Sequence, residues 1–149
     1  MHYLHATEYT HLSGEINSLY HEMAVKMGLS DSVMNILYVI CEKKDRCLQS
    51  EISKLTGISR QTINSAIRNL KKDGIVYLEQ GHGRNTIVCL TEKGKKISEE
   101  KILPIFEIEN KIWNEWTAEE QRQYLTLTKK YRDALRKYLD MRFFSEDIL

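Results

Sequence analysis

The chain has 149 residues, of which 42% are hydrophobic and 29% charged, enough for one domain with a sizeable core or a small domain with long helical extensions. One proline and seven glycines leave few breaks and favour helices. No apolar run approaches the ~20 residues of a membrane helix, and the N-terminus lacks a signal peptide's order, so we expect a cytoplasmic protein without a membrane partner. Three cysteines without CxxC spacing argue against a disulfide framework and a zinc ribbon, and we expect Cys41, Cys47 and Cys89 to be buried thiols.

The charge is unevenly distributed along the chain. The net charge is only +1, but the segment Ser59–Lys96 holds eight Lys or Arg against three Asp or Glu, and the remainder holds fourteen against eighteen. A basic segment within an acidic chain indicates a localised site for a polyanion.

Two amphipathic helices are predicted first. One runs from about Tyr9 to Met27 and ends at Gly28. Ser30 or Asp31 caps the second, which ends in the charged turn EKKDR at 42–46.

A helix-turn-helix is predicted next. A short helix spans roughly Gln49–Thr56, with Ile52 and Leu55 facing inward, and the sequence TGIS joins it to a helix over Ser59–Gly74. Ser59 is expected to cap this helix and Gly74 to end it. Two short helices across a tight turn that contains glycine are typical of helix-turn-helix motifs.

The helix over Ser59–Gly74 has two different faces. Its apolar face carries Ile63, Ala66, Ile67 and Leu70. Its polar face carries Gln61, Asn64, Ser65, Arg68 and Lys72. Amides and guanidinium groups pair with base edges, and the major groove of B-DNA admits one helix. For this helix alone, an ordinary solvated surface is an equally good interpretation.

A β-hairpin is predicted after Gly74, where the pattern changes from helical to alternating. Two β-rich runs flank the sequence GHGRN at 81–85, so His82, Arg84 and Asn85 lie at its tip. A basic hairpin directly after a helix-turn-helix is interpreted as a wing, whose arginine contacts phosphates or enters the minor groove. The alternative for Arg84 alone is a solvated turn residue.

Long helices are predicted for the rest of the chain. Thr91 caps a helix that continues to Trp116, with a kink near 102–103 caused by Pro104. Thr117 and Glu120 form a capping box that opens the last helix. The tail at 142–149 is predicted to fray, or to dock through Phe143 and Phe144.

The first helix and the last two have apolar stripes but no sheet to cover. We therefore expect these stripes to bury against each other and against a second copy of the chain in a homodimer. A two-fold protein places two reading helices roughly 34 Å apart, which matches a palindromic site in double-stranded DNA.

The sequence resembles MarR-type transcription regulators over nearly its whole length. The matching motifs are LQSEISKLTGIS (48–59), QTINSAIRNLKKDGIV (61–76) and GRNTIVCLTEKG (83–94), of which the last is the most specific to the family. The resemblance implies that Arg84 is the wing arginine. It also implies recognition-helix roles for Ser59, Thr62, Asn64 and Ser65. Members are commonly repressors released by small amphipathic ligands, by cysteine oxidation or, in some cases, by metal.

Two positions depart from the family pattern. His82 stands where the family usually has an aspartate that holds the wing arginine, so Arg84 is expected to be less fixed without DNA or to gain a cationic neighbour at low pH. Leu48 stands where the family usually has a hydroxyl cap, so the helix at 49–56 is expected to begin less firmly.

The sequence also bears on four other functions. No nucleophile, base or metal constellation and no nucleotide-binding glycine loop is present, so we expect no enzyme and no cofactor. A metal sensor using His2, His5, His11 and His21 stays open, as does a redox switch, for which Cys47 beside basic residues is the best candidate. A winged-helix protein-interaction module is the remaining alternative.

The sequence therefore predicts a mainly α protein with a small β-hairpin wing. Residues 30–91 form the winged helix-turn-helix DNA-binding domain, and residues 1–29 and 92–149 form a helical dimerisation region. The function expected is a homodimeric, sequence-specific DNA-binding regulator, a repressor with a possible small-molecule effector. The predicted DNA-binding residues are Ser59, Arg60, Gln61, Thr62, Asn64, Ser65, Arg68, Lys72, His82, Arg84 and Asn85.

Overall fold

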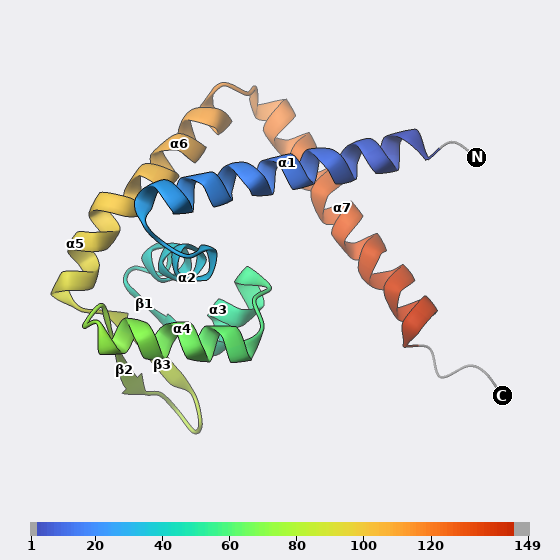
Figure 1. The fold of residues 1–149 in the computed structure, drawn as a ribbon. Coiled ribbons are helices and arrows are strands. Elements are labelled where there is room, and N and C mark those ends of the chain that lie inside the picture. Colours follow the sequence, from blue (N-terminus) through green and yellow to red (C-terminus); the bar gives the residue numbers. More distant parts are fainter. Residues whose placement is uncertain (1–2, 145–149) are drawn as a thin grey trace. The chain divides into compact units, whose positions relative to one another are not determined.

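A computed structural model describes residues 3–144 of the chain. Its helices are α1 (Leu4–Met27), α2 (Asp31–Glu42), α3 (Gln49–Thr56), α4 (Arg60–Lys72), α5 (Glu92–Lys101), α6 (Leu103–Asn114) and α7 (Ala118–Phe143). Its strands are β1 (Arg46–Leu48), β2 (Val76–Gln80) and β3 (Thr86–Leu90). The predicted fold class, mainly α with a winged helix-turn-helix, is confirmed (Figure 1).

The chain divides into two compact units, residues 1–105 and 106–149. The first unit holds the helix-turn-helix and the sheet, and its core is built mainly from α2, α3, α4 and β3. The large side chains that are at most 1% exposed in this core are Ile36, Leu37, Ile40, Ile52, Ile63, Val88, Ile102 and Ile105. Because Ile102 and Ile105 follow α5, the buried core continues past the wing.

Most helix ends carry the signals that the sequence predicted. Ser30 accepts a hydrogen bond from the Val33 N–H at 3.1 Å, and Ser59 accepts one from the Thr62 N–H at 3.2 Å. Gly28 adopts a left-handed φ of 69°, which ends α1. The helix α1 begins at Leu4, five residues before the predicted start at Tyr9, because an exposed helical turn needs no apolar periodicity to form.

The face of α4 was predicted correctly, and that of α3 only in part. Ile63, Ile67 and Leu70 of α4 are buried. In α3, Ile52 is fully buried, but Leu55 is 53% exposed, so the expectation that Leu55 faces inward is wrong. Each residue of an α-helix rotates the side-chain direction by about 100°, so Leu55, three residues after Ile52, points about 60° away from it. Leu55 also lies in the last turn of a helix only eight residues long.

The sheet has a third strand that the sequence pattern did not reveal. The strand order is β1-β3-β2, and both pairs are antiparallel. Arg46 of β1 pairs with Cys89 of β3, and Tyr77 of β2 pairs with the same residue from the other side. An ion pair between Arg46 Nη2 and Glu79 Oε2, at 2.6 Å, joins the two outer strands across β3.

The sequence LTEKG at 90–94, which begins with the last residue of β3, connects the end of α4 to the start of α5. The Thr91 hydroxyl accepts from the Gly94 N–H at 3.0 Å and donates to the Gly74 carbonyl at 2.6 Å. A Cβ on Gly94 would lie 2.1 Å from the Ile75 carbonyl oxygen, so only glycine fits there. This close approach fixes how α4 and the hairpin leave the core.

The predicted kink at Pro104 is confirmed as a break between α5 and α6 at Ile102.

In the second unit, the predicted capping box is present at the start of α7. Thr117 accepts from the Glu120 N–H at 3.1 Å, and Glu120 accepts from the Thr117 N–H at 3.0 Å. Phe143 and Phe144 are 71% and 67% exposed. Residues 145–149 of the predicted tail lie outside the described residues.

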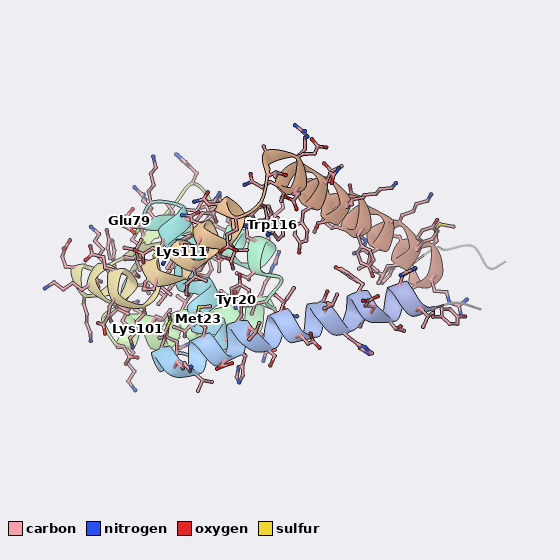
Figure 2. All side chains as sticks on the ribbon, turned by 90° about the horizontal axis from the view of Figure 1, so that it is seen from above. Tyr20, Met23, Glu79, Lys101, Lys111 and Trp116 are labelled. Carbon is pink, nitrogen blue, oxygen red and sulfur yellow. The ribbon has the colours of Figure 1, made fainter. Side chains whose placement is uncertain are left out.

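The helix α1 is covered only near its C-terminal end. Ala24 is fully buried, whereas most of the residues before Tyr20 are exposed. Figure 2 shows Tyr20 and Met23 in the half of α1 that lies near the other helices of its unit, while the N-terminal half extends away from them.

Within the described residues, no single helix is long and apolar enough to cross a membrane. The helices α1 and α2 meet the length and hydropathy required for a membrane span only when they are taken together, and this pair is bent by 91°.

Candidate nucleic-acid interface

The predicted site residues are presented to solvent by α4 and by the hairpin. All eleven are exposed in the structure. The buried Ile63, Ile67 and Leu70 press the opposite side of α4 against the core, which leaves its polar face outward. Figure 1 shows α4 beside the hairpin of β2 and β3.

One stripe of polar side chains follows the length of α4. Its members are Gln61, Ser65, Arg68 and Lys72, at spacings of four, three and four residues, so they lie on one side of the helix. A single helix face that combines an amide, a hydroxyl and two cations provides donors for base edges and phosphates.

The start of α4 binds part of its own polar set. The Ser59 hydroxyl accepts from the Thr62 N–H and donates to Thr62 Oγ1 at 2.9 Å. Both functions of the Ser59 hydroxyl are thus used within the helix. The Thr62 hydroxyl keeps its own proton, which is available for an outside acceptor.

A groove of about 300 Å³ brings part of the predicted set together with residues that the sequence reasoning missed. It lies between α3, α4 and the hairpin. The predicted residues that line it are Arg60, Asn64, Arg84 and Asn85. The unpredicted ones are Gln49, Ser50, Ser53, Ile63 and Thr86. Gln49 and Ser50 could have been found from the sequence, since a helix-turn-helix places the polar start of its first helix near the second.

The groove carries positive charge without a neutralising carboxylate. Neither Asp nor Glu lines it. Among residues 3–144, none of Arg60, Arg68, Lys72 and Arg84 forms an ion pair with a carboxylate. Uncompensated cations on two adjacent elements favour a polyanionic partner.

The hairpin tip is held by its own hydrogen bonds. The Gly81 N–H donates to the Asn85 carbonyl at 2.8 Å, and Gln80 Nε2 donates to the Gly83 carbonyl at 2.8 Å. Gly83 has a φ of +67°, a conformation that glycine adopts without strain. These bonds fix the backbone that carries Arg84, whose side chain no carboxylate of the described chain holds.

The three cysteines do not have the environment of reactive thiols. Cys47 and Cys89 are buried, and Cys41 is half-buried. Burial is the main cause that raises the pKa of each thiol, and it raises the pKa of Cys47 to about 11. A thiol with that pKa is almost entirely protonated at neutral pH, which disfavours the redox switch considered for Cys47.

The N-terminal histidines do not converge in the described part of the chain. His5 and His11 are exposed on α1, and His21 Nδ1 lies 2.9 Å from Asp31 Oδ1 at the start of α2. No group of three or more His, Cys, Asp or Glu side chains in residues 3–144 is arranged to hold a metal ion. His2 lies outside the described residues.

Residues 27–84 match the sequence model of the MarR family. NMB1585, a MarR family regulator from Neisseria meningitidis, is similar in structure, with a TM-score of 0.83 and 15% identity over 95% of this chain and 99% of that chain. A search of curated protein sequences found no significant match.

Two further similar structures contain DNA. A MarR family regulator from Listeria monocytogenes, solved with 26mer DNA, has a TM-score of 0.70 and 19% identity over 97% of each chain. MepR from S. aureus, in a DNA complex, has a TM-score of 0.69 and 18% identity over 90% of this chain and 99% of that chain. The predicted resemblance is therefore confirmed: residues 27–84 match the MarR family model, and the described chain has the fold of MarR family regulators.

Proposed function

We propose that this protein is a homodimeric, sequence-specific DNA-binding transcription regulator rather than an enzyme. The observation that carries the proposal is the groove between α3, α4 and the hairpin, which combines Arg60 and Arg84 with amides and hydroxyls and has no carboxylate. The MarR fold and the two similar structures solved with DNA support it. Residues 30–91 are proposed as the DNA-binding domain.

The two kinds of side chain on this surface suit two kinds of contact. We assign base contacts to Gln61, Asn64, Ser65 and Arg68, because they lie on the outward face of α4. We assign phosphate contacts mainly to Arg60, Thr62, Lys72 and Arg84, with His82 and Asn85 beside them at the hairpin tip. Ser59 contributes chiefly as the cap of α4, because its hydroxyl is already bonded on both sides.

The helices outside residues 30–91 are proposed to form the dimer. Leu12 and Leu19 of α1 are 51% and 62% exposed, and Leu127 and Leu135 of α7 are 63% and 56% exposed. Regularly spaced apolar side chains on long helices are typical of surfaces that a second copy covers. A dimer places two α4 helices on a palindromic operator.

Repression and release by a small ligand complete the proposal. Both follow from the resemblance to the family. A cytoplasmic location also remains a prediction from the sequence.

Salt-dependent DNA binding tests the proposal. Purified full-length protein is titrated against a duplex recovered from its own genome, at several salt concentrations. Neutralised phosphates make the logarithm of the binding constant fall linearly with the logarithm of salt. Affinity without salt dependence, or the absence of binding to any duplex, would instead support a winged-helix module that binds proteins.

A further inference from the structure

A side-chain hydrogen bond links the first helix of the helix-turn-helix to the second inside the groove. Gln49 Nε2 donates to Asn64 Oδ1, across fifteen residues of sequence. Gln49 is the first residue of α3 and is half-buried, whereas Asn64 is exposed on α4. Both residues line the groove together with Arg84 and Asn85.

This bond decides which part of the Asn64 amide is free. An asparagine side chain has one carbonyl oxygen and one amide nitrogen, and the two point in different directions. With Oδ1 engaged by Gln49, one of its two lone pairs is used and the Nδ2 group keeps both of its N–H donors. The side chain also loses rotational freedom before DNA arrives, which lowers the entropic cost of a contact.

We propose that Gln49 is a positioning residue that sets the base preference of Asn64. Gln49 holds the Asn64 amide with its N–H groups toward the duplex, so the complex favours guanine, whose major-groove edge presents two acceptors, over adenine, which presents one acceptor and one donor. This inference rests on the proposed function, since it needs Asn64 to face a base.

The variant Gln49→Glu tests the direction of the bond. A carboxylate only accepts hydrogen bonds, so Asn64 must turn Nδ2 toward residue 49 and present Oδ1 to the DNA. The preferred base then changes to one that presents an amino donor, adenine or cytosine. The variant is expected to fold, because an acidic residue in the first turn of a helix is favourable.

Base preferences are measured by selecting duplexes from a randomised library with the full-length protein and sequencing the bound fraction. Asn64→Ala first identifies the base pair that Asn64 contacts, because the preference there is lost. At this base pair, wild type is expected to favour guanine by roughly tenfold, the value of one well-made contact. Gln49→Ala is expected to reduce this preference severalfold, and Gln49→Glu to replace it.

Ser50→Asp is the matched control for the added charge. Ser50 is adjacent to Gln49 in the same groove, and within the described residues it forms no bond to Asn64. Its substitution is expected to weaken binding to all sequences alike and to leave the base preference unchanged. The double variant Gln49→Ala with Asn64→Ala is expected to show the same preferences as Asn64→Ala alone.

The outcomes separate this inference from the proposed function. If wild type selects a motif but the Gln49 variants select the same motif with the same strength, Gln49 does not position Asn64 and the inference fails while the function stands. A change at base pairs that Asn64→Ala leaves untouched also overturns it. If wild type selects no motif at all, the proposed function itself fails.

Discussion

The core around the helix-turn-helix and the sheet, in the first unit, differs from the last helix, α7, in how its apolar side chains are covered. In the core, Ile36, Leu37 and Ile63 are at most 1% exposed within one chain. In α7, none of the 26 residues is buried, and Leu127 is 63% exposed. Both regions are amphipathic in sequence, so the pattern alone does not tell whether a stripe meets its own chain or another.

This difference suggests a division of labour. The core encloses its own apolar side chains and therefore holds α4 and the hairpin in a fixed geometry. The long helices leave theirs exposed, and in the proposed dimer a second copy covers them and places two α4 helices on one duplex. Four experiments test this difference between the two regions.

The largest effect is expected from charges in the apolar stripe of α7. Leu127→Glu with Leu135→Glu would bury two unpaired carboxylates from each protomer in the proposed dimer, at a cost of roughly 4 kcal/mol or more, about a thousandfold in the dimer dissociation constant. Analytical ultracentrifugation measures the change, and operator affinity falls with it. Lys129→Glu, also exposed on α7 but not part of the stripe, is the control and should stay dimeric. If the Leu127→Glu, Leu135→Glu variant stays dimeric, the apolar stripe of α7 is not the dimer interface.

The next effect concerns the core alone. Gly94→Ala places a methyl group against the Ile75 carbonyl, where a Cβ lies at only 2.1 Å, so the free energy of unfolding should fall by about 2–3 kcal/mol. Urea unfolding followed by circular dichroism measures it. Gly14→Ala is the matched control, since nothing lies within 4 Å of its Cβ and the helix should gain about 0.5–1 kcal/mol. Equal effects would contradict the tight contact at Gly94.

A similar or smaller effect is expected on the reading surface. Arg68→Ala should cost about 1–3 kcal/mol on the cognate site and little on random DNA, if the guanidinium pairs with guanine. Lys72→Ala should weaken all sequences alike and lower the salt slope by about 1. Titrations on both kinds of duplex separate these outcomes. Equal weakening by Arg68→Ala on both would assign Arg68 to the phosphates.

The smallest effect is expected at the capping box of α7. The hydrogen bond from the Thr117 N–H lowers the pKa of Glu120. When the pH falls through the ordinary pKa of glutamate, Glu120 therefore binds fewer protons in the folded chain than in the unfolded chain. The stabilisation of the folded chain by the ionised Glu120 is complete above that ordinary pKa and is lost below the lowered pKa. Glu120→Gln should lower the unfolding midpoint slightly at pH 7 and not in strong acid.

Thr117→Ala supplies the control for the capping box. Because each side chain bonds the backbone of the other, the two single substitutions should not add in the double variant. If the changes in unfolding midpoint from the two single substitutions add in the double variant, or if the effect of Glu120→Gln does not depend on pH, the two residues do not act together.

The helix signals in the sequence were reliable because each acts within a few residues. Ser59, Thr91 and Thr117 were predicted as caps, and each accepts the expected backbone hydrogen bond. For α2 the prediction left Ser30 or Asp31, and Ser30 is the cap. The helix breaks at Ile102, just before Pro104, because the proline ring clashes with the preceding turn. The predicted site residues on α4 are exposed because the apolar face of this helix fixes where its polar face points, and His82, Arg84 and Asn85 are exposed at the tip of the hairpin.

Other features of the site depend on residues far apart in sequence. The strand β1 is three residues long, too short for a pattern, and forms only because β3 lies some forty residues later. The groove and the bond between Gln49 and Asn64 likewise need α3, α4 and the hairpin packed together.

The order of the helices, most of their caps, the hairpin and the polar face of α4 could all be predicted from the sequence, because periodicity and capping are local. Three features became visible only in the folded chain: Leu55 faces solvent, Gly94 lies against the Ile75 carbonyl, and Gln49 donates a hydrogen bond to Asn64. Those three depend on the distance between elements, which packing sets and which a linear pattern does not contain.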